Sequence, residues 1–503
     1  MARKAPCLSF LLSILVTIAM GQERPTKADS YYFFLKGTQL RAEGQLEEAE
    51  GAYLKAIQGS ENPSYIYSTL AEVYFEMWRW DKSEKAAGKA LSLNPENIPA
   101  HNILAKIYLA RAASENKQEV RDRSAALRAK DEFLKIIALD PDNRDAYYSL
   151  GKITYSLSQF EESERYFSRY TELNPFSDTG YMNLGELKIE LGKLTEAQKS
   201  LEKALSINSN NYKGYLLLGR AYELDSLHDQ AASLYEEALK HFPQDILFLN
   251  RLGFSLYILR NYEKALVALN DVFQVDPSNA QAFLTKAKIL HETGRDGDAE
   301  HTYRRLIEED KSNLEARLEF AFFLEDKRDY EGAISEYEAV LGKDKNPPVE
   351  RAFFYNFRLG ILYERSGKFL EAENYLRKSI ELNPKSGEAL NYLGYMLVER
   401  GRNLEEAVEL IKRALVMDSE NGAYLDSLGW AYFRLKNYEK AEIYLKKAIL
   451  KLEDDPVIND HLGDLYLMFN KKEKALAYWE KALKNNIEDK DRVKKKIERL
   501  LRE

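Results

Sequence analysis

Small and apolar residues recur along this chain with a period of 34 residues. In four successive stretches a leucine is followed by a glycine, and a second small residue stands twelve positions after that glycine. These pairs of positions are Gly151 and Ser163, Gly185 and Ala197, Gly219 and Ala231, and Gly253 and Ala265. Such a period marks a repeat array rather than a domain with one central core. The pattern therefore predicts an all-α chain built from helix-turn-helix units.

The pattern extends over thirteen units when the small residue after the leucine is numbered position 8. Position 8 is Gly37, Ala71, Ala105, Gly151, Gly185, Gly219, Gly253, Ala287, Ala321, Gly360, Gly394, Gly429 and Gly463. Position 20 is mostly alanine and position 24 is bulky, as in Ala475 and Trp479. A small residue admits a large side chain of the neighbouring helix, so we expect the helices to interlock. Proline often stands at position 32, where it ends a unit.

These preferences occur together over about residues 30–487 and resemble those of the tetratricopeptide repeat (TPR) family. The resemblance implies a TPR α-solenoid, a right-handed superhelix of about thirteen helix-turn-helix repeats. It also implies a concave groove lined by positions 2, 5, 9, 12 and 13 of the first helix of each unit. Spacings of three and four residues place these positions on one stripe of a helix.

Departures from the repeat predict the domain organisation. About twelve extra residues within 110–128 are charged and lack glycine and proline, which favours a helical insertion. The repeat slips by five residues at Asn346-Pro347-Pro348-Val349, which indicates a kink or a domain boundary. We therefore expect an N-terminal array over 30–346 (units 1–9) and a C-terminal array over 349–487 (units 10–13). Residues 488–503 have the polar amphipathic pattern expected of a capping helix.

The N-terminus has the layout of a secretory signal peptide. Arg3 and Lys4 precede an apolar run from Leu8 to Met20, and a small residue, Gly21, follows at the expected cleavage site. The run is shorter than the roughly 20 residues that span a bilayer, although an uncleaved anchor is the alternative. Cys7, the only cysteine, precedes the run and is not placed for lipid attachment. We expect residues 1–21 to be removed and the protein to be exported, as a periplasmic or cell-envelope protein without a membrane span.

Charge and residue types argue against several functional classes. The net charge of −8 disfavours a general nucleic-acid binder, which needs a basic face. The six histidines are scattered over different units, and the glycines occupy repeat positions rather than a phosphate-binding loop. No catalytic, cofactor-binding or metal-binding residue is predicted, and we do not expect an enzyme. An enzyme or carbohydrate-handling protein built on the array is the remaining alternative.

Position 9 changes character along the chain. It is polar in early units, as in Glu72, Lys152 and Arg220, and mostly aromatic or apolar in later units. Together with neighbouring groove positions, the later units predict a partner-binding stripe of Phe254, Phe322, Phe354, Ile361, Tyr395, Val398, Trp430 and Phe433. Contiguous apolar surface often marks a partner site, and aromatic residues are enriched among binding hot spots. The alternative is that these side chains fill the inside of the superhelix against neighbouring units.

The last units are similar to a bacterial family of exported TPR proteins. The segments that carry this resemblance are Asn391 to Gly401, Tyr424 to Leu435, and Asp460 to Tyr466. Some members are lipoprotein adaptors that deliver substrates to a periplasmic protease, but this sequence lacks their anchor cysteine. The resemblance implies a protein-binding scaffold or adaptor whose partner is a periplasmic protease or an envelope complex. A structural subunit of an envelope or secretion assembly is the alternative.

Overall fold

The computed structural model describes residues 26–113 and 122–502, which form 27 helices and no β-strand. The predicted signal peptide, residues 1–21 with Cys7, lies outside the described residues. None of the helices in these ranges is long and apolar enough to cross a membrane. The chain divides into two compact units, Met1–Asp276 and Pro277–Glu503, each of which is a succession of antiparallel helix pairs.

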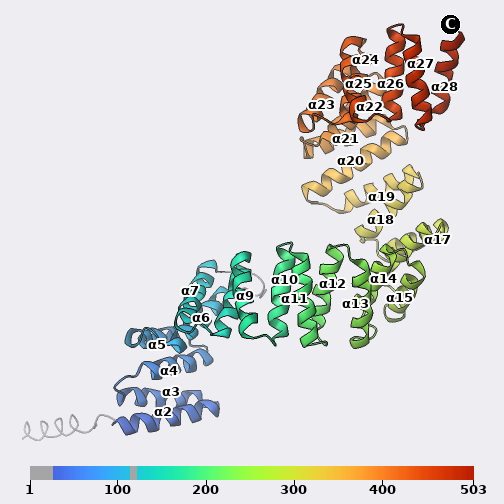
Figure 1. The fold of residues 1–503 in the computed structure, drawn as a ribbon. Helices are drawn as coiled ribbons and strands as arrows, with labels where there is room; N and C mark the ends of the chain where they lie inside the picture. Colours follow the sequence, from blue (N-terminus) through green and yellow to red (C-terminus); the bar gives the residue numbers. More distant parts are fainter. Residues whose placement is uncertain (1–25, 114–121, 503) are drawn as a thin grey trace, which may run out of the picture. The chain divides into compact units, whose positions relative to one another are not determined.

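The first compact unit contains seven helix pairs (Figure 1). They are α2 (Lys27–Ala42) and α3 (Leu46–Gln58), α4 (Ser64–Glu76) and α5 (Trp80–Leu93), α6 (Ile98–Ala112) and α7 (Arg123–Leu139), α8 (Arg144–Ser156) and α9 (Phe160–Leu173), α10 (Asp178–Glu190) and α11 (Leu194–Ile207), α12 (Tyr212–Leu224) and α13 (His228–His241), and α14 (Ile246–Ile258) and α15 (Tyr262–Val275).

The second compact unit contains six pairs followed by a single helix. They are α16 (Ala280–Glu292) and α17 (Asp296–Glu309), α18 (Leu314–Asp326) and α19 (Tyr330–Lys343), α20 (Val349–Arg365) and α21 (Phe369–Leu382), α22 (Gly387–Arg400) and α23 (Leu404–Met417), α24 (Gly422–Arg434) and α25 (Tyr438–Lys451), α26 (Pro456–Met468) and α27 (Lys472–Lys484), and then α28 (Lys490–Arg502). The thirteen pairs correspond one to one with the thirteen units predicted from the sequence.

The two helices of a pair interlock at positions 8 and 24. A Cβ atom added to Gly463 would lie 2.3 Å from the indole of Trp479, and one added to Gly185 would lie 2.4 Å from Leu201 Cγ. Both distances are far below van der Waals contact, so only glycine fits at these two positions. The predicted packing of a small residue against a bulky one is confirmed.

Side-chain caps set where the first helix begins in eleven of the thirteen pairs, whereas α4 and α20 begin after Pro63 and Pro348 without such a cap. Asn211 accepts a hydrogen bond from the backbone N–H of Gly214 at the start of α12, and Ser177 accepts one from Gly180 at the start of α10. Asp245 does the same for Phe248 at the start of α14. Because a capped N-terminus fixes the helix start, these first helices present the same register to their neighbours.

Both departures from the period lengthen helices. Around the insertion, α6 has 15 residues and α7 has 17, whereas α8 and α9 have 13 and 14. Residues 114–121 of the insertion lie outside the described residues. The five-residue slip at Pro347-Pro348 extends α20, which has 17 residues and begins directly after Pro348.

The division between the compact units differs from the boundary that we placed near Pro347-Pro348. The structure divides between Asp276 and Pro277. At the Pro347-Pro348 slip, α19 and α20 remain packed on each other because the extra residues add a turn to α20 instead of a linker.

Candidate partner-binding groove

The eight predicted groove residues differ in how much surface they offer. Phe322 is 41% exposed, and Phe254, Phe354, Tyr395 and Phe433 are half-buried. The remaining three residues are buried: Ile361, Val398 and Trp430. Val398 is completely inaccessible, so its side chain offers no surface to a partner, and for these three the packing alternative describes the structure better. Whether the accessible residues bind a partner stays a prediction.

Seven of these residues lie in the second compact unit, and Phe254 lies in the first. In α14, the ring of Phe254 lies 6.2 Å from that of Tyr257, also on the groove stripe. In the second unit, Phe322 of α18 and Phe354 of α20 are 6.1 Å apart, and both contact Tyr337 of α19 at 6.2 and 6.3 Å. Two predicted groove residues, Phe322 and Phe354, therefore belong to one aromatic cluster on three consecutive helices. The third member, Tyr337, was not predicted to be a groove residue.

Trp430 of α24 is the centre of a second aromatic cluster. Its indole stacks on Phe433 with centroids 4.6 Å apart and on His461 of α26 at 4.0 Å, with both pairs of rings nearly parallel. The indole N–H donates a hydrogen bond to Glu399 Oε1 of α22 at 2.5 Å. Trp430 thus ties three successive first helices together, which explains why it is only 7% exposed.

His461 is a site residue that sequence reasoning missed, because its histidines were tested only for metal spacing. Its Nδ1 lies 2.9 Å from Asp426 Oδ1 in the buried interior. Burial lowers the pKa of His461, but the charges of Asp426, Asp460 and Asp464 raise it by more, so it lies above the usual value. The pair is therefore a buried ion pair when His461 is protonated.

The capping helix joins this charged cluster from the other side. Asp460, which is almost fully buried, accepts hydrogen bonds at 2.7 Å from both Arg492 and Lys496 of α28. Lys496 also donates to Asp464, while Trp479 donates its indole N–H to the same carboxylate at 3.1 Å. The polar side of α28 is thus attached to α26 by ion pairs, and Val493 and Leu500 are its buried apolar residues.

Groove residues of α20, α22, α24 and α26 line one cavity of about 370 Å³, here called the acidic cavity. Its walls include Tyr392, Tyr395, Met396 and Ile458, and its polar lining includes Asn391. Four carboxylates also line it: Glu364, Glu399, Asp426 and Asp455. Of the predicted site residues only Tyr395 lines this cavity directly, although Trp430 holds Glu399 at its edge. No sequence pattern marks these carboxylates, because Asp and Glu are common throughout the chain.

A second hollow of about 580 Å³ adjoins the capping helix. Phe433 lines it together with Met468, Trp479, Lys496 and Leu500. Phe433 therefore faces open space rather than the core, unlike Trp430 one turn before it.

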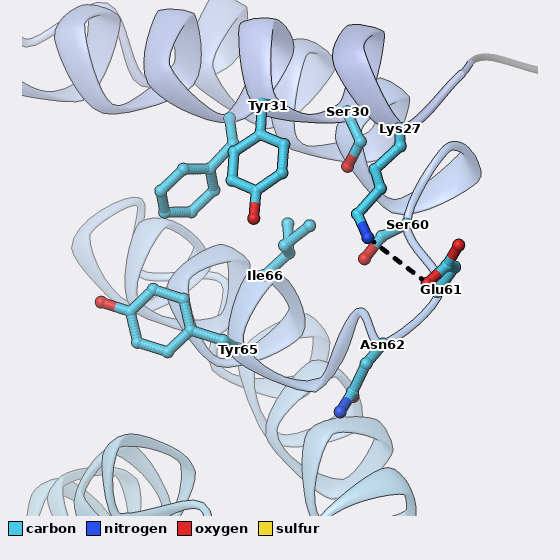
Figure 2. A pocket seen from close by; sticks show the side chains of 9 residues that line it. Lys27, Ser30, Tyr31, Ser60, Glu61, Asn62, Tyr65 and Ile66 are labelled. Carbon is cyan, nitrogen blue, oxygen red and sulfur yellow. Dashed lines mark ion pairs between the residues drawn. The ribbon is translucent and has the colours of Figure 1, made fainter.

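The first two units also present an aromatic hollow, which the sequence analysis did not predict. It has a volume of about 340 Å³, and Figure 2 shows Tyr31, Tyr65 and Ile66 around it. Lys27 and Glu61 form an ion pair at 3.6 Å on its other side. Tyr31 and Tyr65 occupy position 2 of their units. The prediction of a partner-binding stripe relied mainly on position 9, which is polar in these early units, and it therefore did not include them.

The described residues hold no group of three or more His, Cys, Asp or Glu side chains placed to bind a metal ion.

Sequence comparisons identify the family of this chain. Models of the tetratricopeptide repeat match residues 145–177, 182–246, 251–314, 357–422 and 400–456, which together are more than half of the chain. This chain belongs to the tetratricopeptide repeat family. The TPR fold is suited to protein–protein interaction, because it presents an extended surface across successive repeats.

Known TPR proteins match parts of this chain. It is 27% identical to tetratricopeptide repeat protein 21B of Homo sapiens over 194 residues, 38% of this chain and 15% of the human protein. It is 30% identical to TPR repeat-containing protein PA4667 of Pseudomonas aeruginosa over 170 residues, 33% of this chain and 28% of that protein. The chain thus spans well under two thirds of these curated relatives.

One solved structure aligns with nearly the whole chain. The crystal structure of the APC/C hetero-tetramer Cut9-Hcn1 aligns over 97% of this chain and 99% of its own, with 15% sequence identity and a TM-score of 0.38.

Proposed function

We propose that this TPR protein is an exported, non-enzymatic scaffold or adaptor that holds a segment of a protein partner in the groove of its last units. The observation that carries the proposal is the acidic cavity, where groove residues from four successive first helices line one concave volume. Binding sites are typically concave, with apolar walls and a few placed polar groups, and this cavity has both.

The surroundings of the cavity support a preformed site. Trp430 is fixed by two ring stacks and by its hydrogen bond to Glu399. Such a fixed wall costs little conformational entropy when a partner binds, which favours affinity. Phe433 and Phe322 are accessible on the same stripe and extend the surface available to an elongated segment.

Export is a separate part of the proposal, supported by the basic and apolar pattern of residues 1–21. Cell fractionation with N-terminal sequencing of the recovered protein tests it. We expect the protein in the periplasmic or envelope fraction, with an N-terminus near residue 22. Recovery from the cytoplasm with residues 1–21 intact would contradict export. It would not affect the proposed binding role, which is tested separately.

Affinity capture from an envelope fraction, followed by mass spectrometry, tests the binding role. We expect one protein, such as a protease or its client, to be captured in competition with free partner. A stoichiometric membrane complex would instead favour the alternative of a structural subunit. A catalytic activity of the purified chain alone would contradict the scaffold proposal.

A further inference from the structure

We propose that the acidic cavity binds an arginine side chain from a basic segment of the protein partner. This inference rests on the proposed scaffold function and names the chemistry of the segment that the groove takes. The opposite chemistry, capture of an acidic tail, would require lysine or arginine side chains, and none lines the cavity.

The four carboxylates of the cavity lack a lysine or arginine partner. No lysine or arginine in the described part of the chain forms an ion pair with Glu364, Glu399, Asp426 or Asp455. Their partners are instead the hydroxyl of Tyr392, the indole of Trp430, the imidazole of His461 and the backbone N–H groups that Asp455 caps. The cavity therefore gathers four carboxylates without a guanidinium or ammonium group in its lining. The nearest guanidinium groups act on its tyrosines instead, Arg365 on Tyr392 and Arg492 on Tyr395.

Elsewhere in the array, several carboxylates between successive units are paired with such cations, whereas Glu338 accepts hydrogen bonds from tyrosine hydroxyls instead. Arg377 bridges Glu373 and Glu406, Arg41 bridges Glu72 and Glu76, and Arg358 pairs with Glu325. In each of these places an arginine of one unit meets carboxylates of the same or a neighbouring unit. The acidic cavity repeats this arrangement of carboxylates but lacks the arginine, which a partner would supply.

The same lining contains an unused hydrogen-bond acceptor. Asn391 lines the cavity, and its buried Oδ1 accepts no hydrogen bond from any described residue. A buried acceptor without a partner costs free energy, and a donor entering the cavity would recover it. The guanidinium group carries five N–H donors, more than any other side chain, and can serve the amide and the carboxylates together.

The walls of the cavity suit a long side chain with a planar end. Tyr392 and Tyr395 supply aromatic faces, while Met396 and Ile458 supply aliphatic surface for the stem of a long side chain. Burial and the charges of Glu399 and Asp426 raise the pKa of Tyr395, so its phenol stays neutral and available for stacking. A planar guanidinium stacks on aromatic rings and pairs with carboxylates in a fork, which favours arginine over lysine.

The test measures binding of a short fluorescent Gly/Ser peptide that carries two arginines to the full chain, by anisotropy. Matched peptides carry citrulline, lysine or glutamate in place of arginine. The pocket variant is Glu364→Gln with Glu399→Gln, which removes two charges but keeps the acceptors for Tyr392 and Trp430. The control variant is Glu439→Gln with Glu473→Gln, which removes two exposed carboxylates without ion-pair partners on second helices.

We expect the arginine peptide to bind the wild-type chain best. In the pocket variant, the Kd for this peptide should rise about tenfold or more. The control variant should lose less than about twofold, as expected for screened surface charges. Equal losses in both variants, or equal binding of the citrulline peptide, would overturn the proposal. If the pocket variant still captures the wild-type protein partner, the arginine site is wrong while the scaffold function stands. Failure of the wild-type chain to capture any partner would contradict the scaffold function itself.

Discussion

The imidazole of His461 stacks on the indole of Trp430 with ring centroids 4.0 Å apart and planes 10° apart. This contact joins α26 to α24, and the Asp426–His461 hydrogen bond joins the same two helices a second time. It lies next to the acidic cavity, because Asp426 lines that cavity and Trp430 binds its Glu399. The packing of the last units and the geometry of the candidate site therefore depend on the same residues.

The His461–Asp426 pair predicts how stability depends on pH. Because the pKa of His461 is raised in the folded protein, the folded state binds its proton more tightly than the unfolded chain. Its stabilisation is complete below the ordinary histidine pKa of about 6.5 and is lost as the pH rises through the raised value. We expect the melting temperature of the last units to fall over that range. In His461→Gln this fall should disappear, and an unchanged pH profile in that variant would contradict the assignment.

Gly463→Ala should destabilise the last units, because the new methyl group would overlap Trp479. Overpacking of this kind costs about 1–3 kcal/mol. The matched control is Gly88→Ala in α5, where nothing lies within 4 Å of the added Cβ. There the substitution should stabilise the protein by about 0.5–1 kcal/mol through helix propensity. Urea unfolding of both variants measures the contrast, and equal effects would show that the interlock at positions 8 and 24 is loose.

Asp460→Asn should release the capping helix. It removes the charge that Arg492 and Lys496 share, which leaves α28 attached by the Lys496–Asp464 ion pair and by the two buried residues Val493 and Leu500. Hydrogen exchange of α28 amides should speed up by about tenfold or more, since one lost charged hydrogen bond is worth about 1.5–3 kcal/mol. Asp491→Asn, at an exposed carboxylate, should leave exchange unchanged. Equal exchange in both variants would contradict the role of Asp460, because the Lys496–Asp464 ion pair and the apolar contacts would then suffice to hold the helix.

Trp430→Ala and Phe433→Ala should behave differently although both residues were predicted from the same stripe. Trp430 is only 7% exposed, so its removal should cost about 3–5 kcal/mol of stability. Phe433 is half-buried and lines the hollow beside α28, so its removal should weaken partner capture with a smaller loss of stability. Thermal unfolding and affinity capture of the two variants separate packing from binding. A fully stable Trp430→Ala variant would contradict its structural role.

The sequence predicted the fold well because the period acts through local packing. Gly185 and Leu201 belong to one unit, as do Gly463 and Trp479, so the spacing of each pair in the sequence predicts its contact. It predicted the site less well, because exposure at position 9 depends on the neighbouring units. Tyr395 lines a cavity whereas Ile361, at the same position one unit earlier, is buried.

What the sequence missed depends on side chains brought together from three or four units. Asp426 and His461 are 35 residues apart, almost one repeat, and nothing marks them as a pair until the helices are stacked. The same holds for the carboxylates Glu364, Glu399 and Asp455, each unremarkable among many acidic residues of the chain.

The most direct test of the central claim, that the groove of the last units holds a protein partner, is site-specific photo-crosslinking in cells that express the full chain. A photoreactive phenylalanine analogue replaces Tyr395 in the cavity, and in the control it replaces Ile443, an exposed residue of α25. The account predicts a discrete adduct with one protein from position 395 and none from position 443. No adduct from position 395, or the same adducts from both positions, would contradict it.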